Sequence, residues 1–154
     1  MTIYTLGYSG WKIEDVEKEL ARLDAILVDV RMVPRTRWAQ QWNASALHQR
    51  LGDQYVWLKQ FGNKNYKGTF EQIEIADFPT GETRLRELLT KDAAGSTASS
   101  PTSGKSIILM CGCRDVNVCH RKVLAEWLAK LWNADVVHLT RPDNEISSGQ
   151  PTLF

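Results

Sequence analysis

The chain lacks several features that mark membrane and secreted proteins. No apolar run among its 154 residues approaches the roughly 20 that are needed to cross a bilayer. Its first residues, MTIYTLGYSG, lack the charged start and apolar core of a signal peptide. The chain has only three cysteines, a small and uneven number that argues against a disulfide framework. We therefore expect a cytoplasmic protein with reduced thiols and no membrane partner.

The chain also lacks a charge excess and a nucleotide-binding glycine loop. A formal net charge of +1 argues against a uniformly basic nucleic-acid surface, although it permits a local basic patch. The stretch SSPTSGKS, residues 99–106, ends like a P-loop, but Ser99 stands where that motif requires its first glycine. A predicted strand follows the Gly-Lys-Ser, so no helix N-terminus would face a phosphate.

The hydrophobic pattern is that of alternating strands and helices. TIYTLG predicts a strand, the spacing of Ile13, Val16 and Leu20 predicts a helix, and AILVDVR predicts a strand buried on both faces. This βαβ unit implies a parallel pair. Further expected elements are a helix at 44–51, a strand at 55–58, a helix capped by Thr80, the strand SIILMC, a helix with a stripe of Val123, Leu124, Trp127, Leu128 and Leu131 that ends near Asn133, and the strand ADVVHL. The fold class is α/β: a small three-layer domain with a mostly parallel sheet and helices on both faces.

The domain organisation follows from composition. Apolar residues make up 43% of the chain and charged residues 24%, as in ordinary globular proteins. We predict one α/β domain over residues 1–140, with a flexible loop at about 92–105 that is rich in small polar residues. Residues 141–154 are predicted to form a flexible tail.

Polar chemistry follows three of the predicted strands. Tyr8 and Ser9 follow the first, Asp29 and Arg31 the second, and the segment from Cys111 to Arg121 the third. Ligands of parallel α/β sheets bind beyond the carboxyl ends of the strands. The sequence therefore predicts a polar pocket at this edge, where these groups converge.

The stretch LMCGCRDVNVCHRKVLAEWL holds all three cysteines and supports several interpretations. Zinc binding by Cys111, Cys113, Cys119 and His120 has the right atoms, but adjacent residues at a helix start are expected to have difficulty reaching one tetrahedral ion. As a second interpretation, Asp115 or Asn117 caps the helix and Cys119 lies in its first turn. The helix dipole, Arg114 and Arg121 would then lower the pKa of the Cys119 thiol, and His120 could relay a proton.

An anion pocket is the interpretation that we favour for this segment. Free N–H groups at the helix start, together with Arg31 and Arg121, would hold a phosphate or carboxylate. The simplest alternative is that Cys111 and Cys113 are small buried residues at a strand end. We expect no bound metal and no cofactor.

These segments together resemble the family known as domain of unknown function 488. The resemblance covers residues 3–139 and depends on YTLGYSG, VDVRMVPRTR, YVWLKQFGN and the cysteine segment. The family's clearest mark, Cys-His-Arg at a helix start, is matched by Cys119, His120 and Arg121, together with Cys111; the second motif is matched by Asp29, Arg31 and Pro34. The family usually has histidine where this chain has Tyr8. The resemblance implies the α/β fold and the pocket, and no particular reaction.

The segment between Arg31 and Lys67 combines basic and aromatic side chains. Its members are Arg35, Arg37, Trp38, Trp42, His48, Arg50, Trp57, Lys59 and Lys64. Arginine interleaved with aromatic residues suits phosphate contact and base stacking. The alternative is a loop packed by its own tryptophans, with solvated charges.

The last residues resemble the peptide by which bacterial replication and repair proteins dock on the sliding clamp. Gln150, Leu153 and Phe154 fit that motif, whereas Pro151 stands where it has leucine. A polar tail with two large apolar residues needs a partner, or a patch on its own domain.

These observations predict a protein with an anion-binding pocket that acts on nucleotides or nucleic acid in DNA processing or repair. Tyr8, Ser9, Asp29, Arg31, Pro34, Cys111 and Arg121 would bind the ligand, and Cys119 or His120 would carry any catalysis. The tail residues Gln150, Leu153 and Phe154 would bind the clamp. The alternatives are a non-catalytic binding module with structural cysteines and a metal-dependent site on the cysteine cluster.

Overall fold

A computed structural model describes residues 1–68, 72–90 and 105–142. The strands are β1 (Thr2–Gly7), β2 (Ala25–Asp29), β3 (Tyr55–Trp57), β4 (Ser106–Cys111) and β5 (Asp135–His138). The α-helices are α1 (Ile13–Leu23), α2 (Ala44–Leu51), α3 (Phe78–Thr90) and α4 (His120–Trp132). Short 3-10 turns occur at Gln40–Trp42, Gly52–Gln54, Lys59–Phe61 and Val116–Val118.

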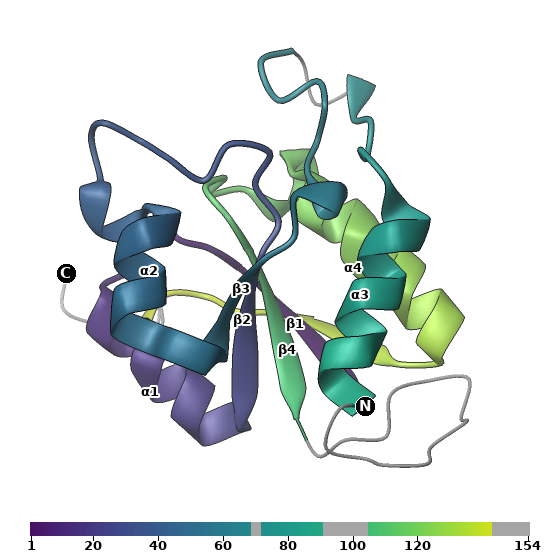
Figure 1. The fold of residues 1–154 in the computed structure, drawn as a ribbon, viewed down its shortest axis with the longest axis horizontal. Helices are drawn as coiled ribbons and strands as arrows, with labels where there is room; N and C mark the ends of the chain where they lie inside the picture. Colours follow the sequence, from purple (N-terminus) through teal and green to yellow (C-terminus); the bar gives the residue numbers. More distant parts are fainter. Residues whose placement is uncertain (69–71, 91–104, 143–154) are drawn as a thin grey trace, which may run out of the picture.

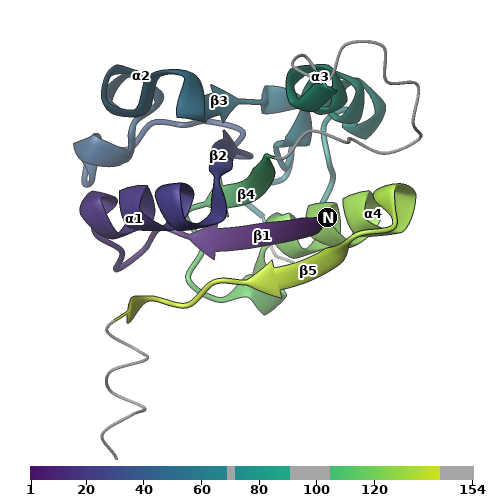
Figure 2. The same ribbon diagram turned by 90° about the horizontal axis from the view of Figure 1, so that it is seen from below.

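The five strands form one sheet in the order β3-β2-β4-β1-β5, and every pair is parallel. Helices α1 and α2 cover one face, and α3 and α4 cover the other (Figures 1 and 2). The predicted three-layer α/β class is therefore confirmed. Among the described residues, no helix is both long and apolar enough to traverse a lipid bilayer.

The continuous apolar run of β4 shows why this sheet needs helices on both sides. Ile107 and Leu109 pack into the core beneath α3 and α4, whereas Ile108 and Met110 pack into the core beneath α1 and α2. Successive side chains of a strand point to opposite faces, so a strand without polar positions must be covered twice.

One predicted boundary is wrong. Helix α3 begins at Phe78, two residues before Thr80, and the amide of Thr80 donates a hydrogen bond to the Asp77 carboxylate at 3.3 Å. Pro79 fits in the first turn because amides there need no partner within the helix. Asp77, and not Thr80, therefore accepts a side-chain hydrogen bond from the first turn of α3.

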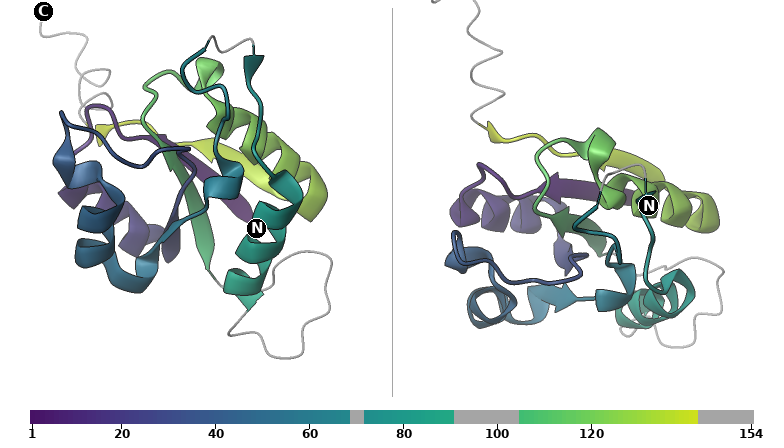
Figure 3. Two further views of the ribbon diagram at one scale, coloured as in Figure 1. Left: turned by 45° about the horizontal axis from the view of Figure 1, so that its top comes forward. Right: turned by 90° about the horizontal axis from the view of Figure 1, so that it is seen from above.

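The carboxyl ends of the strands gather at one edge of the sheet, at the top of Figure 1. The segments that follow β2, β3 and β4 lie beside one another there, as Figure 3 shows from above. This is the edge at which the sequence predicts a pocket. Residues 91–104 and 143–154, which contain most of the predicted loop and tail, lie outside the described residues, as do Gln150, Leu153 and Phe154.

Candidate functional site

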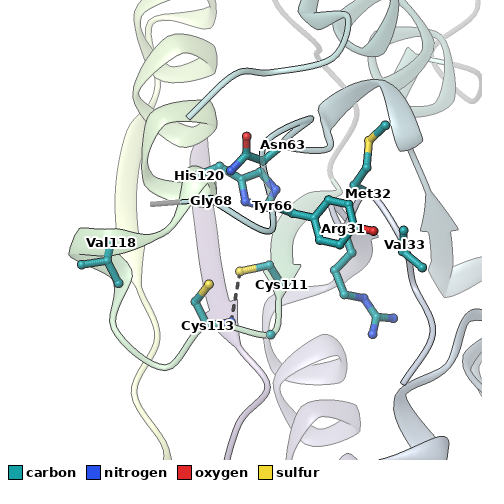
Figure 4. Close-up of a pocket in the computed structure, with 11 residues that line it drawn as sticks. Arg31, Met32, Val33, Asn63, Tyr66, Gly68, Cys111, Cys113, Val118 and His120 are labelled. Carbon is teal, nitrogen blue, oxygen red and sulfur yellow. Dashed lines mark hydrogen bonds between the residues drawn. The ribbon is translucent and has the colours of Figure 1, made fainter. Parts of the chain in front are cut away.

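A cavity of about 430 Å³ opens at the carboxyl ends of the strands. We call it the strand-end pocket (Figure 4). Its lining comes from three segments: Arg31, Met32 and Val33 after β2; Asn63, Tyr66 and Gly68 after β3; and Cys111, Gly112, Cys113, Val118 and His120 between the end of β4 and the start of α4. The pocket therefore combines apolar walls with thiol, imidazole, amide and phenol groups.

The wall contributed by β4 and α4 is a compact group of sulfur and imidazole atoms. Cys111 ends β4, and Cys119 and His120 stand at the start of α4. One donor atom from each of these three residues lies within 4.8 Å of the other two. The prediction that the adjacent Cys119 and His120 would have difficulty facing one point is therefore wrong, because Cys119 is still extended (φ −115°, ψ 140°) and the helix begins only with His120.

His120 has a defined tautomer. Its Nε2 lies 2.6 Å from the backbone oxygen of Val30, and a carbonyl oxygen can only accept, so Nε2 carries the proton. The lone pair of Nδ1 then faces the Cys119 sulfur at 4.0 Å. Burial lowers the pKa of His120, which keeps the ring neutral near pH 7.

The three thiols differ in exposure and in acidity. Hydrogen bonds from Cys111, then Cys119, lower the pKa of Cys113 to about 2. A hydrogen bond from Cys111 favours the Cys119 thiolate, but the bond between Cys119 and Cys113 and burial outweigh it and raise the pKa of Cys119 to about 11. Hydrogen bonds to Cys113 and Cys119 also raise the pKa of Cys111. The cluster thus stabilises one thiolate, at Cys113.

This result corrects the prediction for Cys119. Cys119 does not carry the expected lowered pKa, and its side chain does not line the pocket: the residue is 2% exposed and precedes the helix, while Asp115 caps the turn Val116–Val118. The alternative of two small buried cysteines at the strand end fits Cys111, which is 1% exposed, but not Cys113, which is exposed and lines the pocket. A C-x-C spacing gave no indication of which sulfur faces solvent.

Arg121 is buried behind the thiols instead of facing a ligand. Its Nη1 donates to the backbone oxygen of Cys113 at 2.8 Å and to the sulfur of Cys111 at 3.5 Å, and its Nε donates to Thr5 Oγ1 at 3.4 Å. It does not line the pocket. Arg121 therefore fixes the loop after β4 and places a positive charge beside the sulfur atoms.

Arg31 lines the pocket but is held by protein groups. Its Nε and Nη2 donate to the two carboxylate oxygens of Asp29 at 2.9 and 2.7 Å, and Nη2 also donates to the backbone oxygen of Trp42. Asp29 is fully buried and accepts a further hydrogen bond from the Tyr55 hydroxyl at 2.5 Å. Burial, followed by the charge of Asp29, raises the pKa of Tyr55, which keeps the phenol protonated.

The remaining predicted ligand-binding residues shape the edge of the pocket without lining it. Tyr8 stacks on Trp42 with ring centroids 4.9 Å apart, and its ring lies 5.3 Å from the Arg31 guanidinium. Ser9 donates a hydrogen bond to the backbone oxygen of Gly112 at 2.7 Å, and the backbone oxygen of Pro34 accepts one from Ala44. Of the nine predicted ligand-binding and catalytic residues, the structure brings Arg31, Cys111 and His120 to the pocket wall.

Two pocket residues that sequence reasoning did not single out are Asn63 and Tyr66. The Oδ1 atom of Asn63 accepts hydrogen bonds from the amides of Asn65 and Glu74 at 3.0 and 2.9 Å, which closes the loop after β3. Tyr66 is half-exposed, and Lys67 lies 5.7 Å from its ring. Asn63 belongs to the segment YVWLKQFGN, one of the motifs on which the family resemblance depends, so this motif was a reason to consider it. No motif in the sequence pointed to Tyr66.

The basic-aromatic segment separates into buried and exposed parts. Trp42 is buried, and Trp57 donates its indole proton to the backbone oxygen of Arg31 at 2.8 Å. Trp38 is 90% exposed, next to the exposed Arg37. Only Trp38, of these three tryptophans, has a ring free for stacking.

Fold and site together define a small three-layer α/β protein with thiol and imidazole groups in a pocket at the strand ends. The chain belongs to the family described as Domain of unknown function DUF488, whose model matches residues 12–128. The match includes the segments around Asp29 and Cys119 and begins after YTLGYSG. No curated protein and no solved structure matches the chain.

Proposed function

We propose that the protein binds a nucleotide or a nucleic-acid segment in the strand-end pocket and acts in DNA processing or repair in the cytoplasm. The observation that carries this proposal is the composition of the pocket, in which the apolar Met32, Val33 and Val118 stand beside the ring of Tyr66. Pockets for small organic ligands have mostly apolar walls and a few fixed polar groups. A planar base suits such walls, with the amide of Asn63 at their edge.

The surroundings of the pocket favour an anionic ligand. The segment that begins at Arg31 continues to the exposed Arg35, Arg37 and Trp38, and Lys67 follows Tyr66. In the described ranges, no ion pair includes Arg35 or Arg37. Guanidinium groups with an adjacent exposed indole suit phosphate contact and base stacking.

Binding of nucleoside monophosphates and short single-stranded DNA, measured by calorimetry or fluorescence anisotropy, tests the proposal. Tyr66→Ala and Trp38→Ala are expected to weaken binding by about tenfold, in line with about 1–3 kcal/mol per stacked base. Trp127→Ala is the matched control because Trp127 is also half-exposed but lies on α4, outside the pocket lining. Equal losses in all three variants, or no binding by the unaltered protein, would contradict the proposal.

Catalysis and simple binding remain two forms of this proposal. His120 is the candidate for proton transfer because its ring lines the pocket and Nδ1 lacks a proton. Burial of Cys111 and Cys119 at 1% and 2% exposure favours the non-catalytic form for those two thiols. Product analysis with the bound nucleotide separates the two forms: His120→Gln should abolish turnover in the first, and no turnover occurs in the second.

We also propose that residues 150–154, QPTLF, dock on a bacterial sliding clamp. The support is the sequence, in which a glutamine precedes a leucine and a phenylalanine at the spacing of that peptide. A Leu153→Ala/Phe154→Ala double variant should lose clamp binding in surface plasmon resonance, whereas Ser148→Ala should retain it. Unchanged binding by the double variant would refute this assignment.

A further inference from the structure

The group formed by Cys111, Cys119 and His120 has the dimensions of a metal site. Zinc bonds of about 2.3 Å to sulfur and 2.0–2.1 Å to nitrogen place neighbouring tetrahedral ligands about 3.6 Å apart. The Cys119 sulfur and His120 Nδ1 are 4.0 Å apart, and the complete set lies within 4.8 Å. Small side-chain rotations would bring these three atoms to bonding distance of one ion.

The hydrogen bond made by Nε2 of His120 leaves Nδ1 unprotonated and able to bind a metal ion. Metal-binding histidines usually donate their other ring N–H to a carboxylate or a backbone carbonyl, which fixes the tautomer and the ring orientation. Here Nε2 donates to the backbone oxygen of Val30, the first residue after β2, at 2.6 Å. Nδ1 is thus unprotonated and faces the sulfur of Cys119.

Cys113 supplies a fourth donor from the pocket side. Its amide donates to the Cys111 sulfur at 3.4 Å, and its own sulfur, which is not one of the three atoms within 4.8 Å, would turn toward them to complete the set. Figure 4 shows the Cys113 and Cys111 sulfur atoms next to each other at the pocket wall. Three sulfurs and one imidazole nitrogen are a common ligand set of structural zinc sites.

The charge of Arg121 is compatible with this assembly. Arg121 is buried, and no carboxylate in the described part of the chain forms an ion pair with it. Its hydrogen bonds go to a hydroxyl, a backbone oxygen and the Cys111 sulfur. A buried cation is costly without a compensating charge. A divalent ion with three thiolates and a neutral imidazole carries a net charge of −1, the same as the single Cys113 thiolate of the metal-free cluster, so the guanidinium stays neutralised when the ion binds.

We propose that Cys111, Cys113, Cys119 and His120 bind one zinc ion in the wall of the strand-end pocket. Thiolate and imidazole ligands in tetrahedral array select zinc over hard cations such as magnesium. The ion would tie the end of β4 to the start of α4 and displace the protons of the thiols it binds. This inference does not depend on the proposed nucleotide ligand. It is compatible only with the binding form of the proposed function, because an Nδ1 atom bound to zinc cannot accept a proton.

The test begins with the full-length protein purified without added chelator. Elemental analysis should find one zinc per chain. After dialysis against chelator, titration with Co²⁺ alone should give the absorption bands of a tetrahedral thiolate complex, and Zn²⁺ should remove them. A folded protein that gives neither result overturns the proposal.

Variants identify the ligands. Cys119→Ser should abolish the cobalt spectrum, and Cys113→Ser, at an exposed position that tolerates substitution, should weaken zinc affinity at least about tenfold. His48→Ala, which removes an exposed histidine on α2, is the control and should bind as the unaltered protein does. Unchanged affinity in Cys113→Ser would overturn the four-ligand site even if Cys119→Ser loses the metal.

Discussion

Asp29 is the residue on which the β2 side of the pocket most depends. Its carboxylate accepts hydrogen bonds from the backbone amide and guanidinium of Arg31 and from the hydroxyl of Tyr55, and it has no exposure to solvent. Two buried charges stabilise a fold only while both are present. The position of Arg31 at the pocket wall therefore requires Asp29, although Asp29 itself does not line the pocket.

We expect Asp29→Ala to lower the free energy of unfolding by about 3–5 kcal/mol, because it leaves the Arg31 charge buried and unpaired. Tyr55→Phe is the matched control: it removes one of the hydrogen bonds to the same carboxylate and should cost about 1–2 kcal/mol. Urea unfolding at constant pH measures both values. If the two variants lose the same free energy, the ion pair does not have this role.

His120 makes stability depend on pH. Because burial lowers its pKa in the folded state, the unfolded chain takes up a proton as pH falls through about 6.5 while the folded protein does not. The folded state therefore loses stability on acidification, by up to about 1.4 kcal/mol per pH unit for this group. The thiolate at Cys113 adds a dependence of the same sign.

His120→Gln should retain the Cys113 contribution and lose that of His120. We therefore expect a shallower rise in the free energy of unfolding between pH 5 and 7 than in the unaltered protein. Urea unfolding at several pH values, with chelator present, gives both curves. Parallel curves would mean that His120 titrates alike in the folded and unfolded states.

At the scale of elements, hydrophobic spacing predicts where the strands and helices lie, but it does not always predict which face of a helix is buried. The stripe predicted for α4 included Trp127 and Leu131, which are about half-exposed, whereas Ala125 and Trp132 are buried. Apolar residues surround this helix on more than one side, so spacing alone could not select the face that packs on the sheet. The end of the helix at Asn133 was predictable, since asparagine tolerates the left-handed conformation (φ 52°) found there.

The end of β1 approaches the loop after β4 so closely that only glycine fits. A Cβ atom at Gly7 would lie 1.7 Å from the backbone oxygen of Cys113 and 3.0 Å from Nη1 of Arg121. This contact brings the thiol segment against the sheet. Since the clash is with backbone, a larger residue must displace the loop that carries Cys113.

We expect Gly7→Ala to cost about 1–3 kcal/mol of stability, as overpacking does, and to alter the rate at which Cys113 is alkylated. Gly112→Ala is the control in the same loop, because its Cβ would lie 3.3 Å or more from the ring of Tyr8. Thermal unfolding and alkylation with iodoacetamide measure the two effects. A Gly7→Ala protein no less stable than Gly112→Ala would contradict the close approach.

At the scale of the whole molecule, the sequence predicted where a pocket forms and could not predict which groups face into it. Parallel strands place their carboxyl ends together, so the meeting of Arg31, Cys111 and His120 followed from topology. Which way Arg121 and Cys119 turn depends on packing between segments about 100 residues apart, such as the contact of Arg121 with Thr5. Hydrophobic patterns carry no information on such pairings.

Although the formal net charge of the chain is only +1, exposed cationic side chains are concentrated on the loops after β2, β3 and β4. Arg35, Arg37, Lys67 and Arg114 are exposed on these loops, and none of the ion pairs among the described residues includes them. Contacts between cations and phosphates release counterions, so binding should weaken as salt rises.

If single-stranded nucleic acid lies across these loops, each phosphate contact contributes about 0.7 to the slope of log affinity against log salt. We expect Arg35→Glu/Arg37→Glu to weaken DNA binding at low salt and to reduce the magnitude of that slope by about 1.4, two contacts at about 0.7 each. Lys130→Glu reverses an exposed charge in the last turn of α4, at the opposite end of that helix from His120, and should leave the slope unchanged. Anisotropy titrations at several salt concentrations measure the slopes. Equal slopes for the double variant and the Lys130→Glu control would show that nucleic acid does not use the loop after β2, whatever the pocket itself binds.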